Sequence, residues 1–130
     1  MPIDVGLDLV RVLDVEESLR GEHGARYLAR IYTEREVADC TSGDVIDPAR
    51  IAGRFAAKEA TLKVISSGED GISMRDIEVR REASGRVHLE LHGAAAELAA
   101  AVGVRELALS ITHEAGFAAA VVVATRAAAS

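Results

Sequence analysis

The sequence has 130 residues, which is enough for one domain with its own hydrophobic core. Hydrophobic residues make up 49% of it and charged residues 28%, a balance that excludes a disordered chain. The net charge of −6 and the aromatic content of 3% argue against a nucleic-acid partner, because such binding needs a basic face or stacking aromatic rings.

The first third of the chain predicts one strand followed by short helices. Apolar residues alternate with small or polar ones over residues 3–12, as in a strand with one buried face. Short helices are expected from Asp14 and over residues 25–31. A third helix is expected from the capping-box pattern at 33–36 to about Cys40.

The rest of the chain predicts one long helix among four strands. After a loop at residues 41–44, Asp47-Pro48 begins the longest helix, because Asp is a favoured N-cap and Pro fits the first helical turn. This helix extends to about Ile65. Strands at 76–81, 86–91, 104–112 and 117–125 and a helix at 94–102 follow. We predict the α+β class for a single domain, residues 1–130, with a mostly antiparallel sheet packed against the long helix and shorter helices.

The last predicted strand is apolar on both of its faces from Phe117 to Ala124. A strand of this kind needs cover on both sides. In a domain this small, we expect another subunit to supply the second cover.

Three features of the sequence predict a cytoplasmic protein with no membrane partner. Cys40 is the single cysteine, which excludes an intramolecular disulfide and a site of several thiolates. No apolar run approaches the ~20 residues that span a bilayer. The opening Met1-Pro2-Ile3-Asp4 lacks the positive charge of a signal peptide.

Lysine is rare in this chain, which has thirteen arginines but only two lysines, Lys58 and Lys63, on either side of Glu59. An ammonium is a compact point charge that can lose its proton, whereas a guanidinium is planar and cannot. We interpret the two lysines as positions that require an ammonium, with chance clustering as the alternative.

One stripe of the long helix carries a carboxylate among apolar side chains: Ile51, Phe55, Glu59 and Leu62. A carboxylate in such surroundings is costly unless a cation or a donor compensates its charge. Lys63, four residues later, could do so as an ion pair. Alternatively Glu59 holds a divalent metal, and the cations Arg54, Lys58 and Lys63 meet phosphate oxygens.

Asp8 is the best second carboxylate for such a metal. An Asp within a strand is disfavoured, and Gly6 is expected to leave open space beside it on the same face. Mg²⁺ usually takes one or two carboxylates and keeps its other positions for water and phosphate. The alternative for Asp8 is a solvent-facing acid on an edge strand. His113 lies at the end of a predicted strand, where a histidine is more often a structural group than a functional one.

Five blocks of the sequence, in one order, resemble a known family: GLDLV at 6–10, RFAAKEATLK at 54–63, RDIEV at 75–79, LHG at 91–93 and LSITH at 109–113. The chain is similar to the holo-acyl-carrier-protein synthases. These transferases move 4′-phosphopantetheine from coenzyme A to a serine of apo-acyl carrier protein and release 3′,5′-ADP.

The resemblance implies that Asp8 and Glu59 bind Mg²⁺ at the pyrophosphate of coenzyme A, with Glu59 and Lys63 catalytic. It implies coenzyme A contacts at Arg54, Lys58, Lys63, Ser67, Gly68 and His113. It leaves open whether Glu59, Lys63 or a metal-bound water takes the serine proton. It also implies a homotrimer with active sites between subunits.

The chain departs from the family pattern at Arg11, Asp14 and Met74, where the family often has Glu, Arg and Trp. We therefore expect carrier docking on a basic patch that includes Arg11, Arg20 and Arg26, because local charge steers encounter even at negative net charge. The alternative function is a trimeric coenzyme A- or nucleotide-binding protein of the same fold without transfer activity. The sequence does not distinguish a fatty-acid carrier from a polyketide carrier.

Overall fold

A computed structural model describes residues 2–66, 68 and 71–128. Its helices are α1 (Val12–Arg20), α2 (Gly24–Ile31), α3 (Glu34–Asp39), α4 (Pro48–Ile65) and α5 (Gly93–Ala101). Its strands are β1 (Ile3–Arg11), β2 (Thr41–Ser42), β3 (Val45–Ile46), β4 (Ile77–Arg81), β5 (Val87–Leu91), β6 (Val104–Glu114) and β7 (Phe117–Arg126). The predicted α+β class and the predicted long helix are confirmed.

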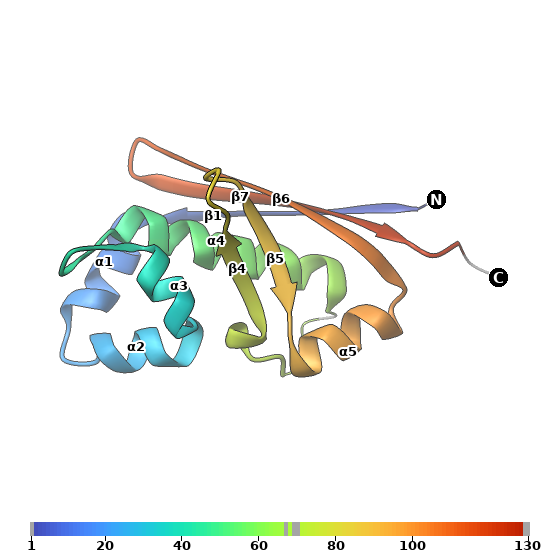
Figure 1. Ribbon diagram of the computed structural model, residues 1–130, viewed down its shortest axis with the longest axis horizontal. Coiled ribbons are helices and arrows are strands. Elements are labelled where there is room, and N and C mark those ends of the chain that lie inside the picture. Colours follow the sequence, from blue (N-terminus) through green and yellow to red (C-terminus); the bar gives the residue numbers. More distant parts are fainter. Residues whose placement is uncertain (1, 67, 69–70, 129–130) are drawn as a thin grey trace.

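The main sheet has the order β1-β7-β6 and is antiparallel throughout. β6 and β7 form a hairpin through Ala115 and Gly116, whose φ angles of 53° and 82° belong to the left-handed region. A two-residue turn with positive φ at both positions matches the twist of the strands that it joins. In Figure 1 this sheet forms one layer, and α4 runs along its inner face.

α4 is the centre of the molecule, because it packs against the main sheet and against the β4–β5 hairpin. Small residues bring helix and sheet together: Ala56, Ala57 and Ala60 on α4, and Ala118, Ala120 and Ala124 on β7. Helices α1, α2 and α3 gather at one end of this core and α5 at the other (Figure 1).

Gly6 shows how closely β1 approaches α4. A Cβ at this position would lie 2.1 Å from the carbonyl oxygen of Ala60, so only glycine fits without a shift of the backbone. The prediction that Gly6 leaves open space beside Asp8 was therefore wrong, because the helix backbone fills that space. Asp8 is two residues after Gly6, and Glu59 is one residue before Ala60, so this contact places the two carboxylates on neighbouring elements.

Local capping explains why the helices begin where they do. The Asp47 side chain accepts a hydrogen bond from the Ala49 amide at 2.9 Å, and Pro48 is the first residue of α4. Thr33 and Glu36 form the predicted capping box at the start of α3. The predicted loop at 41–44 is instead a small hairpin of β2 and β3, which turns through Gly43.

The outer face of the main sheet, opposite α4, carries a row of exposed aliphatic side chains from β1. Ile3, Val5, Leu7 and Leu9 are each between 61% and 64% exposed. In this single chain β7 thus has α4 on its inner face and an open outer face. Among the described residues, no helix is long and apolar enough to cross a membrane.

Candidate active site

Three hollows in the surface share one lining residue, Glu59, and have volumes of about 570, 530 and 440 Å³. The loop hollow is lined by Glu59, Leu62, Lys63, Ser66, Gly68, Gly71 and Ile72. The strand hollow is lined by residues 8–11, Asp14, Val15, Ser18, Tyr27, Phe55 and Glu59. The arginine hollow is lined by His23, Arg26, Tyr27, Arg30, Ile31, Phe55, Glu59 and Met74. A carboxylate therefore stands where all three meet.

The charge of Asp8 acts on Glu59 across the contact between β1 and α4. Partial burial raises the pKa of Glu59 above its usual range, and the negative charge of Asp8 raises it further, while Lys63 opposes the rise. A cation bound beside both carboxylates would offset the charge that raises the pKa of Glu59. Their hard oxygen ligands suit Mg²⁺, which commonly binds proteins through one or two carboxylates.

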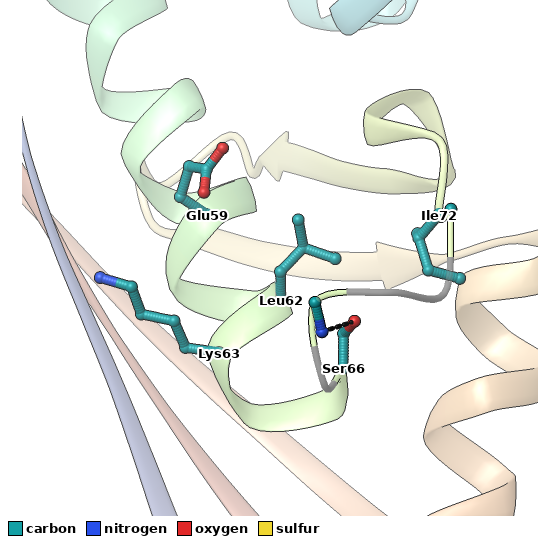
Figure 2. Close-up of a pocket in the computed structure, with 7 residues that line it drawn as sticks. Glu59, Leu62, Lys63, Ser66 and Ile72 are labelled. Carbon is teal, nitrogen blue, oxygen red and sulfur yellow. Dashed lines mark hydrogen bonds between the residues drawn. The ribbon is translucent and has the colours of Figure 1, made fainter.

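Lys63 pairs with Asp8 rather than with Glu59. Its Nζ donates to the carbonyl oxygen of Leu7 at 2.6 Å and lies 3.2 Å from Oδ1 of Asp8. Figure 2 shows Lys63 directed toward the strands of the sheet while Glu59 points another way. The ion pair between Glu59 and Lys63, which their spacing of four left open as an alternative, is therefore not the pair that the structure forms.

The turn after α4 closes the loop hollow. The amide of Gly68 donates to Oγ of Ser66 at 3.0 Å, as drawn in Figure 2. Gly68 has a φ of 95° and Gly71 a φ of 63°, conformations that glycine adopts without strain. Backbone amides at glycines in such conformations can face an anion. Ser67, predicted to contact coenzyme A, lies outside the described residues.

Lys58, the other lysine of the long helix, is in the core rather than at the surface. Its side chain has no exposed area, and Nζ donates to Oε1 of Glu36 at 2.7 Å. It also donates to the carbonyl oxygens of Met74 and Ile77 at 2.8 and 2.5 Å. These bonds use all three ammonium hydrogens, so the predicted direct contact with coenzyme A does not fit this position.

Arg54 and His113 lie apart from the three hollows just described. Arg54 is 5% exposed, and its Nε and Nη2 have no hydrogen-bond partner among the described residues. Buried donors without acceptors are costly, so this guanidinium suits an anion that completes its bonds. It leaves α4 about 140° around the helix axis from Glu59. His113 is exposed at the turn end of β6, across β7 from β1.

Basic side chains surround the arginine hollow. Arg26 and Arg30 line it together with His23. The other two predicted docking residues have acidic neighbours: Arg11 lies 3.9 Å from Asp14, and Arg20 lies 3.7 Å from Glu16.

Tyr27 is a lining residue that the sequence prediction missed. It lines both the strand hollow and the arginine hollow, and its hydroxyl group hydrogen-bonds that of Tyr32 at 2.8 Å. The scarcity of aromatic residues was the available signal, because the chain has only two tyrosines.

A family model, the 4′-phosphopantetheinyl transferase superfamily, matches residues 4–122. The holo-[acyl-carrier-protein] synthase of Halorhodospira halophila is 42% identical over 120 residues, which cover 92% of this chain and 94% of that protein. The chain belongs to the 4′-phosphopantetheinyl transferase superfamily. The family and the transferase class predicted from the sequence are therefore confirmed.

Other members of this superfamily agree in sequence and in fold. The holo-[acyl-carrier-protein] synthase of Koribacter versatilis is 39% identical over 125 residues, covering 95% of this chain and 98% of its own. The Chronobacterium ammoniagenes ACPS-CoA complex has a TM-score of 0.82 at 29% identity and covers 98% of this chain and 100% of that one. The Helicobacter pylori synthase in complex with coenzyme A has a TM-score of 0.79 at 28% identity and covers 94% of this chain and 100% of that one.

Within this phosphopantetheinyl transferase, the residues predicted for the site fall into two groups. Asp8, Glu59, Lys63 and Gly68 lie around the meeting point of the hollows. Arg54 and His113 form no part of that lining, and Lys58 is a buried structural cation.

Proposed function

We propose that this chain transfers the 4′-phosphopantetheine arm of coenzyme A to a serine of apo-acyl carrier protein. The observation that carries the proposal is the pair of carboxylates, Asp8 and Glu59, held beside Lys63 where three hollows meet. The names of the matched relatives, holo-[acyl-carrier-protein] synthases, and the coenzyme A bound in two similar structures support it.

Asp8 and Glu59 are the residues that would hold Mg²⁺, and the raised pKa of Glu59 beside Asp8 supports this choice. A bound Mg²⁺ would supply positive charge to the oxygens of the coenzyme A pyrophosphate. Lys63 adds a further positive charge next to Asp8.

The serine oxygen then attacks the phosphorus atom of the arm, and the bond to 3′,5′-ADP breaks. Positioning and charge stabilisation account for most catalysis in such transfers. Glu59 is the carboxylate placed to receive the serine proton. The positively charged Lys63 stabilises charge beside it and can give up a proton of its own.

The hollows around Glu59 suit the two substrates differently. The loop hollow is lined by Lys63 and Gly68 together with the apolar Leu62 and Ile72, a mixture that suits a phosphate followed by an uncharged arm. The arginine hollow carries Arg26, Arg30 and His23 and suits an acidic carrier protein. Arg11 and Arg20 extend the basic patch, although each also lies near a carboxylate.

We further propose a homotrimer with its active sites between subunits. Four exposed aliphatic side chains of β1 form an apolar row that a second copy would cover. Arg54 and His113 lie away from Glu59 within one chain, so a neighbouring subunit could bring its own copies of them to the nucleotide. The single free and buried cysteine fits a reducing compartment, and we propose a cytoplasmic location.

Intact-mass measurement of a carrier protein tests this function. After incubation of apo-acyl carrier protein with coenzyme A, Mg²⁺ and the protein, we expect the carrier to gain the mass of one phosphopantetheine arm. The variant Asp8→Asn should stay folded and lose this Mg²⁺-dependent gain. An unchanged carrier mass, with coenzyme A still bound, would instead support the alternative of a binding protein without transfer activity. Fatty-acid and polyketide carriers assayed side by side would identify the acceptor.

A further inference from the structure

Lys58 ties three parts of the fold together through one buried ammonium group. Its Nζ reaches from α4 to Glu36 of α3 and to the carbonyl oxygens of Met74 and Ile77. Burial lowers the pKa of Lys58, and the charge of Glu36 opposes this change. A buried charge of this kind persists only when its partners are well placed.

The two carbonyl acceptors belong to the segment 71–77, which forms the far wall of two hollows. Ile72 of this segment lines the loop hollow, and Met74 lines the arginine hollow. Residues 71–73 have no helix or strand to hold them, and a short 3₁₀ turn follows over Met74–Asp76. The bonds from Lys58 are therefore a direct link between this wall and α4.

Glu36 is the fixed end of the same network. It is fully buried, and its Oε1 accepts the amide of Thr33 at 2.9 Å as well as Lys58. Its Oε2 accepts the amide of Val79, just after the wall segment, at 2.9 Å. Glu36 is thus held by α3 and β4 independently of Lys58.

We propose that Lys58 is a positioning residue for coenzyme A: it fixes the 71–77 wall at a set distance from Glu59, the next residue of the same helix. This inference rests on the proposed function, in which the loop hollow receives the arm of coenzyme A. Three acceptors around one point match the three hydrogens of an ammonium, whereas the planar guanidinium fork does not match them. That requirement explains a lysine here in a chain of thirteen arginines.

Two variants separate the wall contacts from the buried charge pair. In Glu36→Gln, the amide can still accept from the α3 capping box. Lys58 keeps its hydrogen bonds to both wall carbonyls in this variant, because the carbonyls of Met74 and Ile77 are unchanged. In Lys58→Met with Glu36→Gln, the chain keeps its volume and has no unpaired buried charge, but the wall contacts are gone. Both variants lose the ion pair, and only the second loses the wall.

The decisive readouts are the Kd and KM for coenzyme A. We expect the double variant to raise both on the order of 10- to 100-fold, because small misplacements of a binding wall are costly. Glu36→Gln should stay within about 3-fold of the wild type, since its wall contacts persist. Loss of folded protein alone lowers the apparent kcat but leaves KM unchanged, so a merely structural role predicts no change in KM for either variant.

Amide hydrogen exchange over residues 72–77 is a second readout that does not depend on activity. We expect faster exchange in the double variant than in Glu36→Gln. Equal constants and equal exchange in the two variants would overturn the positioning role. A wild-type protein that binds coenzyme A but transfers nothing refutes the proposed function alone, and the Kd values then still decide the role of Lys58.

Discussion

Lys58 and Lys63 lie five residues apart on α4 and have opposite surroundings. Lys58 is fully buried among acceptors, whereas the side chain of Lys63 is 52% exposed beside Asp8. The rarity of lysine identified both positions in the sequence. The partners could not be identified there, because Glu36 and the wall carbonyls come from other elements of the fold.

The exchange Lys63→Arg tests whether the reaction needs an ammonium at this position. Arginine pairs with a carboxylate at least as well as lysine does, so the contact with Asp8 should survive. Arginine cannot release a proton near neutral pH, and it spreads its charge over a plane. We therefore expect kcat at saturating substrates to fall by at least ~100-fold, the lower range of a positioned acid–base group.

Arg26→Lys is the matched control, because it makes the reverse exchange at a position where charge alone is expected to matter. Its turnover should stay near that of the wild type. Wild-type turnover in Lys63→Arg would show that Lys63 serves only as a positive charge.

The apolar stripe of α4 indicated Glu59 correctly as an unusual carboxylate, and the structure places it beside Asp8. The spacing of four residues to Lys63 suggested a pair within the helix. The structure gives Lys63 to β1 instead, because the close approach at Gly6 brings the strand within its reach. Helical periodicity relates residues within one helix, so it does not predict a partner such as Asp8 that belongs to a strand.

At the scale of elements, the contact between β1 and α4 depends on one glycine. In Gly6→Ala the new methyl group would overlap the carbonyl oxygen of Ala60, and a backbone atom cannot rotate away. We expect a loss of about 2–3 kcal/mol in the free energy of unfolding, at the upper end of overpacking effects. Denaturant titration at fixed protein concentration measures it.

Gly21→Ala provides the control for this substitution. Gly21 has a φ of −72°, and the nearest atom to an added Cβ is 3.9 Å away. This change should leave stability unchanged or raise it by about 0.4–1 kcal/mol, because alanine restricts the unfolded chain. Equal losses in the two variants would refute the close contact at Gly6.

The joint between α3 and the β4–β5 hairpin depends on Glu78, whose side chain is 2% exposed. Burial by itself raises the pKa of this carboxyl. The hydrogen bonds from Arg35, Thr33 and His92 outweigh burial and lower the pKa to about 2. A carboxylate with a lowered pKa stabilises the fold above its unfolded pKa and loses this effect as the pH falls toward its folded value.

The pKa of Glu78 is about 2 in the folded protein, compared with the usual value of 4.5. Between pH 4.5 and pH 2 we therefore expect the stability of the wild type to fall more steeply than that of Glu78→Gln. The difference should be at most about 3 kcal/mol across this range. Unfolding free energies measured at several pH values give both curves. Parallel curves for the two proteins would show that Glu78 makes no special contribution.

The elements that the sequence predicted well are those specified locally. Asp47-Pro48 and the capping box at Thr33 carry their own start signals, and both helices begin there. The small hairpin of β2 and β3 was missed, because two residues per strand give no periodicity. The network of Glu78 joins residues more than forty positions apart, which no local pattern reveals.

For the whole molecule, the exposed row on β1 predicts the state of assembly. We expect the wild type to sediment at three times the chain mass of 13.7 kDa. Val5→Asp places a charge in the middle of the apolar row and should release monomers. In a monomer this aspartate faces water, because Val5 is 63% exposed there.

Val45→Asp is the control, since Val45 is 70% exposed but lies on β3, away from the row. It should leave the sedimentation coefficient unchanged. A wild-type protein that sediments as a monomer at micromolar concentration would refute both the trimer and active sites between subunits.

The alanine-rich contact between α4 and β7 has a consequence for how this chain can vary. Nine of the eighteen buried hydrophobic residues described are alanines. Alanine scanning identifies most buried core residues by the stability lost on truncation, but it removes nothing at positions that are already alanine. Enlargement is the damaging change, because these buried positions are already packed against neighbouring elements. In saturation mutagenesis of these alanine positions, substitutions by larger residues should therefore be the destabilising ones. Lineages that carry a larger residue on α4 should carry a smaller one opposite it on the sheet.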